Sequence, residues 1–190
     1  MMLNGVRRSV QGYRSDHATT NGETSMTPTL RDSMHLVSDP ENLDQSVREV
    51  FETMLGVQCR TGDCLDNLNE DGAAVSVTAV VGFGGILSGA CVFRCDAATA
   101  RHIASCMAGM TFQSVDDVVK DAIGEICNML AGTWKSKVPH LAANCGLSVP
   151  AVITGSDYDL HVQSPEFKVC QTYAFDDSRF ELIIVCDGLQ

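Results

Sequence analysis

Apolar residues recur at helical spacing through residues 114–137, which read SVDDVVKDAIGEICNMLAGTWKSK. At about 100° per residue they share one broad face: Val115, Val118, Val119, Ala122, Ile123, Ile126, Cys127, Leu130 and Trp134. Ser114 and Asp117 have the spacing of a capping box, and Pro139 follows as a stop. The pattern predicts a long helix with one face against a core.

The opposite side of this helix is polar and contains small residues. Asp121, Glu125, Asn128 and Gly132 fall together there. Glu125 and Asn128 are neighbours on the helix surface, and Gly124 and Gly132 remove bulk beside them. Because a glycine inside a helix costs about 1 kcal/mol relative to alanine, the pattern indicates that something approaches closely. Taken by themselves, however, a Glu and an Asn beside small residues are more often a plain solvated helix face than a site.

Two other stretches have helical spacing, and they span 40–55 and 97–108. Each lies between a capping aspartate and a stopping glycine: Asp39 and Gly56 for the first, Asp96 and Gly109 for the second. The second helix has Ala100, Ile103, Ala104 and Met107 on its inner side. Its register predicts that His102 is exposed.

Runs rich in β-branched or alternating apolar residues predict strands, at 74–83, 86–95, 148–154, 158–163, 166–175 and 180–186. The glycine-rich segment 82–85 joins the first two as a hairpin. A phosphate-binding loop is the alternative, but no GKS or GKT sequence and no helix follow. Residues 57–72 are predicted to form turns and 140–147 a connection. This order predicts an α+β domain with antiparallel strands packed under helices.

The length of 190 residues suits one domain with a substantial core and a tail. Residues 1–37 lack periodicity and are predicted to be a disordered leader before a domain at 38–190. No apolar run is long enough to span a bilayer, and no secretory signal is evident, so we expect a cytoplasmic protein without membrane contact. The net charge of −11 argues against a nucleic-acid partner.

Nine cysteines are scattered through apolar surroundings, an odd number with no CxxC pair and no histidine at ligand spacing. This pattern argues against a disulfide framework or a zinc site. We expect most of these thiols to act as small core hydrophobes, and no metal or cofactor to be held by the chain.

The run GEICNMLAG at 124–132, followed by Lys135, resembles the signature helix of the CheX-type chemotaxis phosphatases, which are related to CheC and FliY. The shared pattern is a Glu, two residues, an Asn, a small-residue turn and a basic residue, placed after a hairpin and a shorter helix. The resemblance extends over roughly residues 40–188. It implies the CheX-like α+β fold, an antiparallel sheet packed against the long signature helix and two further helices.

Members of this family dephosphorylate the aspartyl phosphate of CheY-like response regulators. The resemblance therefore implies a phosphoaspartate phosphatase acting in chemotaxis or two-component signalling. By the same resemblance, Asn128 would orient the attacking water, and Glu125 would form a salt bridge with the active-site lysine of the receiver domain.

The resemblance also implies how the partner is engaged. Asp121, Gly124, Gly132 and Lys135 would lie in the contact with the phosphorylated receiver domain. That partner would bring its own Mg2+, so no metal ligand is expected in this chain. A homodimer formed through sheet edges is implied as well.

The sequence departs from related branches at two places. The CheC branch carries a second Glu–Asn pair on its first helix, whereas neither Glu49 nor Glu52 is followed by an Asn three residues on. This predicts a single site, as in the CheX branch. Thr133 and Trp134 stand where small or polar residues are more usual. The alternative function is a non-catalytic CheX-like module that binds a receiver domain or mediates dimerisation, with Asn128 as a surface amide.

Overall fold

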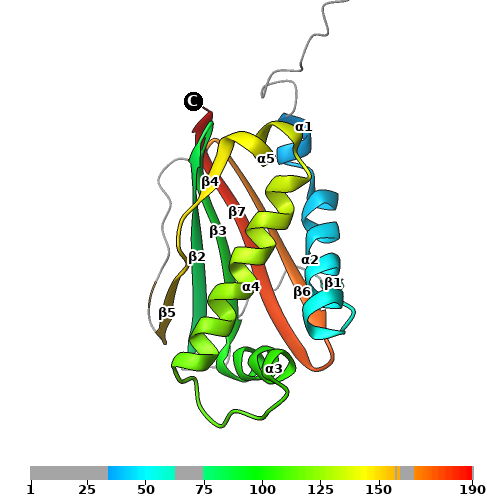
Figure 1. Cartoon of the computed structure of the whole chain (residues 1–190), viewed down its shortest axis with the longest axis vertical. Helices are drawn as coiled ribbons and strands as arrows, with labels where there is room; N and C mark the ends of the chain where they lie inside the picture. The colour runs from blue at the N-terminus through cyan, green and yellow to red at the C-terminus, as the bar shows by residue number, and fades with distance from the viewer. Residues whose placement is uncertain (1–33, 63–74, 157, 159–164, 190) are drawn as a thin grey trace, which may run out of the picture.

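The computed structural model describes residues 34–62, 75–156, 158 and 165–189. In this part of the chain a seven-stranded antiparallel sheet carries the long helices on one face (Figure 1). This arrangement confirms the predicted α+β fold. The elements in chain order are α1 Met34–Val37, α2 Pro40–Leu55, β1 Arg60–Gly62, β2 Ser76–Gly85, β3 Leu87–Asp96, α3 Ala97–Ala108, α4 Asp117–Ser136, α5 Pro139–Asn144, β4 Cys145–Leu147, β5 Ala151–Gly155, β6 Phe167–Phe175 and β7 Ser178–Leu189.

The strand order is β1-β6-β7-β3-β2-β4, and β5 also pairs with β2. The predicted hairpin is confirmed, since β2 and β3 pair from Ser76 opposite Asp96 to Phe83 opposite Gly89. Both β4 and β5 run antiparallel along the outer side of β2, β4 at its end and β5 nearer its beginning. Residues 145–155 thus form one interrupted edge strand, and this strand passes beside α4 (Figure 1).

The predicted helices α2 and α3 form with the expected boundaries. Asp39 accepts a hydrogen bond from Glu41 N at 3.0 Å, and Asp96 accepts one from Thr99 N at 2.6 Å. These bonds satisfy amides that the first turn leaves without helical partners. His102 is only partly exposed, because its Nδ1 lies 2.9 Å from Ser178 Oγ. Among the described residues, no helix is long and apolar enough to cross a membrane.

The long helix α4 begins later than the sequence predicts. Its N-cap is Asp116, which accepts a hydrogen bond from Val119 N at 3.0 Å, and not Ser114. An aspartate satisfies the free amide and also places a negative charge at the positive end of the helix dipole. Val118, predicted to face the core, is 55% exposed. It lies about two turns before Glu125 and shares its outward side.

The connections differ most from the prediction. Residues 60–62, predicted to be turn-like, form the edge strand β1. The segment predicted as a connection at 140–147 contains most of α5 and all of β4. Pro139 is the first residue of α5, where its missing N–H costs no helical hydrogen bond.

Two further boundaries move. The strand predicted from residue 148 begins at Ala151, after Pro150, and the strand predicted at 158–163 falls almost entirely outside the described residues. Helix α1 lies inside the predicted leader. Val37 in α1 is fully buried, and Asn42 Nδ2 donates to Leu36 O at 2.6 Å. The folded domain therefore includes residues 34–37, whereas 1–33 lie outside the described residues.

Aromatic rings hold α2 and α4 on the sheet. Phe180 of β7 stacks on Phe51 of α2 with a centroid separation of 4.7 Å. Trp134 of α4 lies 5.2 Å from Phe83 of β2, also between centroids. The departure at Trp134 is therefore a core contact, on the side of α4 away from the polar residues.

Most described cysteines are buried, as predicted for small core hydrophobes, and the buried ones are Cys91, Cys95, Cys127, Cys145 and Cys186. Burial raises the pKa of Cys95 and of Cys186 well above the ordinary thiol value. These thiols stay protonated, and a protonated thiol is a poor nucleophile and metal ligand.

Candidate functional site

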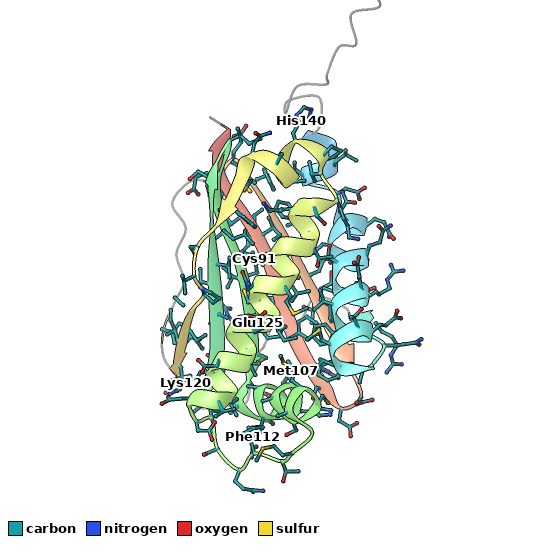
Figure 2. The ribbon with its side chains drawn as sticks, in the orientation of Figure 1. Cys91, Met107, Phe112, Lys120, Glu125 and His140 are labelled. Carbon is teal, nitrogen blue, oxygen red and sulfur yellow. The ribbon has the colours of Figure 1, made fainter. Side chains whose placement is uncertain are left out.

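The outward side of α4 carries a stripe of polar and small residues. Asp121, Glu125, Asn128 and Gly132 follow one another at spacings that keep them on one side of a helix. Asp121 and Glu125 are exposed, and Asn128 and Gly132 are partly exposed. Figure 2 labels Glu125 on α4, which crosses the molecule in front of the sheet. The stripe therefore lies on an open surface.

The Glu125 and Asn128 side chains have no hydrogen-bond or ion-pair partner among the described residues. Their neighbours on the same helix are paired differently: Lys120 Nζ lies 2.9 Å from Asp117 Oδ1, in an exposed ion pair. A carboxylate and an amide thus stand next to each other with their acceptors and donors available to another molecule.

Gly124 lies beside the stripe and Gly132 within it, and both face other parts of the same chain. A Cβ at Gly124 would approach Pro150 Cβ to 3.3 Å and Val152 Cγ2 to 3.4 Å, and Gly124 is buried. A Cβ at Gly132 would lie 3.8 Å from Leu147 Cδ1. The close approach at Gly124 is therefore made by the β4–β5 segment without any partner, whereas a Cβ at Gly132 would make only an ordinary contact.

Lys135 is also engaged within the chain. Its Nζ donates to Ala142 O at 3.2 Å and, at shorter range, to Cys145 O. These bonds tie the end of α4 to α5 and to the start of β4. The ammonium group therefore stabilises the turn that leads into the β4–β5 segment.

Cys127, next to the stripe in sequence, points the other way. It is fully buried, and its Sγ lies 3.6 Å from Ala79 O and 3.7 Å from Cys91 O. The hydrogen bond with Cys127, together with burial, raises the pKa of the Cys91 thiol. The thiol pair packs α4 onto β2 and β3 and presents no nucleophile to the outward face.

The described residues contain no group of three or more His, Cys, Asp or Glu side chains placed to hold a metal ion. The polar pair on α4 supplies one carboxylate and one amide, too few ligands for a protein-held Mg2+ site. The chemistry that this stripe supports is the orientation of a water molecule and the pairing of Glu125 with an external cation.

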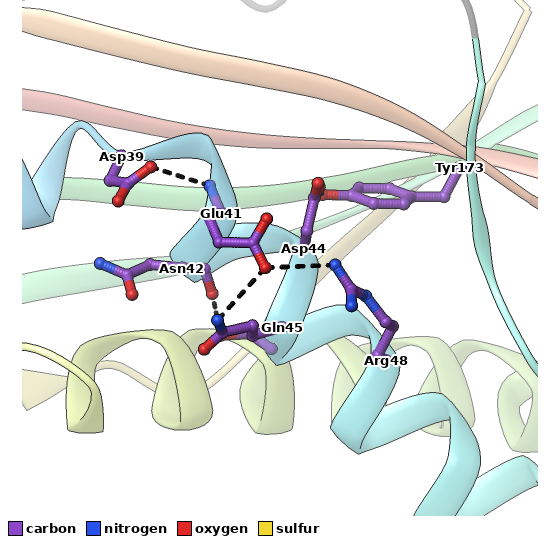
Figure 3. A network of polar contacts seen from close by, with 8 residues as sticks. Asp39, Glu41, Asn42, Asp44, Gln45, Arg48 and Tyr173 are labelled. Atoms are coloured by element: carbon purple, nitrogen blue, oxygen red, sulfur yellow. Dashed lines mark hydrogen bonds and ion pairs between the residues drawn. The ribbon is translucent and has the colours of Figure 1, made fainter.

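A separate cavity of about 380 Å³ lies on α2, β1 and β6, and it shares no residue with the stripe; its lining residues are Asp44, Arg48, Cys59, Arg60, Thr61 and Tyr173. Tyr173 Oη donates to Asp44 Oδ1 at 2.6 Å. Burial is the larger cause that raises the pKa of the Tyr173 phenol, and the hydrogen bond to the Asp44 carboxylate raises it further. Figure 3 shows Tyr173 beside Asp44, and Arg48 paired with Glu41. The sequence does not predict this cavity, because it does not predict β1.

The sequence also does not predict the role of the segment 148–150 as the neighbour of the stripe. The sequence Ser-Val-Pro favours a short, rigid connection, because proline fixes its own backbone angle φ. Only the pairing of β4 and β5 with β2 shows that this connection lies against α4.

The α+β architecture, an antiparallel sheet crossed by a helix with an open Glu-x-x-Asn stripe, matches known proteins of the chemotaxis-phosphatase class. Residues 77–174 match the sequence model of the family described as chemotaxis phosphatase CheX. The CheY-P phosphatase CheX of Thermotoga maritima is 30% identical over 113 residues, which cover 59% of this chain and 72% of that relative. The chain therefore belongs to the CheX family, as the signature helix predicts.

Solved structures share the fold. A CheC-like superfamily protein from Shewanella sp. PV-4 superposes with a TM-score of 0.65 at 21% identity, covering 78% of this chain and 97% of that one. The complex of CheX with CheY, BeF3 and Mg2+ from Borrelia burgdorferi gives a TM-score of 0.59 at 21% identity, with coverages of 78% and 97%. These similarities confirm the CheX-like architecture.

Proposed function

We propose that this protein hydrolyses the aspartyl phosphate of a CheY-like response regulator, with Glu125 and Asn128 as the site residues. The observation that carries the proposal is the open stripe of α4, where both side chains lack partners among the described residues. Family membership and the CheY-P phosphatase of Thermotoga maritima support the reaction. The CheX–CheY complex of Borrelia burgdorferi supports the class of partner.

Asn128 has the chemistry needed to orient water. Its amide oxygen accepts a hydrogen bond from a water molecule and holds the water oxygen in line with the phosphorus atom. A neutral amide does this without repelling the phosphoryl oxygens, as a second carboxylate would. An acyl phosphate is already reactive, so positioning supplies most of what the reaction requires.

Glu125 has the charge needed to dock the receiver domain. It lies one helical turn from Asn128, and its exposed carboxylate can pair with the partner's active-site lysine. Asp121 extends the negative charge by one more turn toward the start of α4. Mg2+ held by the receiver domain neutralises phosphoryl charge in this class of reaction, and no residue of this chain is required to bind it.

A phosphate-release assay on a phosphorylated receiver domain tests this function. The parental protein should accelerate release, and Glu125→Ala should weaken partner binding by on the order of 2–5 kcal/mol and turnover with it, because a docking ion pair is lost. Asn144→Ala is a control at an exposed polar residue away from the stripe, whose side-chain Nδ2 donates to His140 O within α5. A parental protein that binds the receiver domain without accelerating release would instead support the non-catalytic module.

We also propose that the protein acts in the cytoplasm, where receiver domains act. We further propose that it forms a homodimer through a sheet edge. Strand β1 pairs only with 172–174 of β6. Among the described residues, no strand pairs with the outer edge of β6 at 167–171. An open edge of this length is able to pair with a second copy. Light scattering should give twice the chain mass, and a monomer at micromolar concentration would contradict the dimer.

A further inference from the structure

The connection between β4 and β5 runs along the flank of the α4 stripe. Leu147 lies beside Gly132 and Pro150 lies against Gly124. The two glycines are about 12 Å apart along the helix axis. Three residue steps, from Leu147 to Pro150, reach at most about 10 Å, so the connection runs alongside the helix with little slack. Asn128 is midway between the glycines. Ser148 and Val149 lie between these two contacts, so they are the residues of the connection nearest to Asn128 along the helix axis.

This connection is held firmly in place. Ser148 N donates to Gly82 O at 2.9 Å, and Gly82 N donates to Ser148 Oγ at 2.8 Å. Strands on both sides of it pair with β2, and Pro150 fixes its own backbone angle. The backbone at Val149 is thus fixed from both ends, so little conformational freedom is lost when a partner binds it.

Val149 itself packs on little of its own chain. Its side chain is 87% exposed, the largest exposure among the large exposed hydrophobic residues of the described chain. On the other flank of the stripe Val118 is 55% exposed and shares the outward side of Glu125. An apolar side chain on a fixed backbone beside polar groups can be buried by a partner at little cost in conformational entropy.

We infer that Val149 contacts the phosphorylated receiver domain and strengthens its docking beside Asn128. The inference rests on the proposed function and adds a second element to the docking surface, which otherwise consists of α4 alone. The receiver domain is the occupant because the contact is continuous with Glu125 and Asn128, whose chemistry fits a phosphoaspartate and a lysine. The partner should therefore present an apolar side chain beside its phosphorylation site. Val149 touches no reacting atom, so its contribution is to KM and not to kcat.

Three variants at one position test the contact, with the dephosphorylation rate measured against receiver concentration. Val149→Asp should raise KM at least about tenfold, and Val149→Ala about fivefold, with kcat within a factor of two of the parental value. Val149→Ile should restore the parental KM. The control Ile153→Asp should leave both constants unchanged, because Ile153 is 41% exposed on the face of β5 opposite Val152, which packs on α4.

Direct binding of the receiver domain activated with beryllium fluoride separates the two hypotheses. If Val149→Asp keeps the Kd and KM of the parental protein, the proposed contact is wrong. The proposed function would still stand if Asn128→Ala loses turnover. If the parental protein does not dephosphorylate the receiver domain, the proposed function is wrong. In that case, weaker binding of the receiver domain by Val149→Asp than by the parental protein would still support the contact. Because Val149 is exposed, each variant should keep the parental melting temperature.

Discussion

Substitution of Lys135 can show whether this residue stabilises the fold or contacts the partner. In the structure its ammonium donates to Ala142 O at 3.2 Å and to Cys145 O. The variant Lys135→Met keeps the length and helix propensity of the side chain and removes only the charged donor. It leaves two carbonyls of the α5–β4 turn without this partner.

The expected loss follows from those two bonds. A hydrogen bond from a charged group contributes about 1.5–3 kcal/mol when it is well buried, and Lys135 is only partly buried. We therefore expect the free energy of unfolding to fall by about 2 kcal/mol in total. For a chain of this length, that loss corresponds to a melting temperature lower by about 4–8 °C.

The assay combines thermal unfolding with dephosphorylation kinetics at 25 °C. Lys135→Met should be less stable but keep the parental KM and kcat. Lys137→Met is the matched control, since Lys137 Nζ pairs at 2.9 Å with Glu49, whose side chain is 60% exposed. Such a pair contributes less than about 1 kcal/mol. A parental melting temperature combined with a raised KM in Lys135→Met would refute this reasoning and place Lys135 in the partner contact.

Other substitutions test the remaining contacts. Gly124→Val should lower stability by about 1–3 kcal/mol in urea unfolding, because its side chain would collide with Pro150; an unchanged midpoint would contradict this packing. A chain beginning at Ser38 should be less stable by about 2 kcal/mol than one beginning at Met34, since it loses the buried Val37, and equal unfolding midpoints would show that α1 is dispensable. Burial raises the pKa of Cys59 from its ordinary value of 9.0 to about 12, so the unfolded chain releases this proton first and stability should fall as pH rises above 9. The fall in melting temperature between pH 8 and 10.5 should be smaller in the variant Cys59→Ser, and an identical fall would contradict the assignment.

The elements that the sequence predicts correctly are those determined by residues close to one another in the chain. Helices α2 and α3 have an aspartate and a glycine at their ends, and the hairpin has alternating strands around a glycine-rich turn. In each case the deciding contacts lie within a few residues of one another. The Glu125–Asn128 pair is predicted for the same reason, because its spacing alone places both side chains on one helix face.

The parts that the sequence does not predict depend on contacts across the fold. From the sequence, Gly124 is expected to make room for a partner, whereas in the structure Val152 of β5 packs against it. Lys135 is expected from the sequence to lie in the partner contact, whereas in the structure its ammonium group donates to carbonyls of α5 and β4. Both depend on the pairing of residues 145–155 with β2, which no periodicity in that short segment specifies. Pro139 is ambiguous for a local reason, since proline suits both the position after one helix and the first turn of the next.

The function of Asn128 is the central claim, and separate measurements of turnover and binding on one variant test it most directly. In Asn128→Ala, kcat for dephosphorylation of a saturating receiver domain should fall by at least about 100-fold, because the water is no longer oriented. The Kd for the receiver domain activated with beryllium fluoride should stay at the parental value, since Glu125 and the flanking segment remain intact. A parental kcat in this variant would contradict the account, whatever its affinity for the receiver domain.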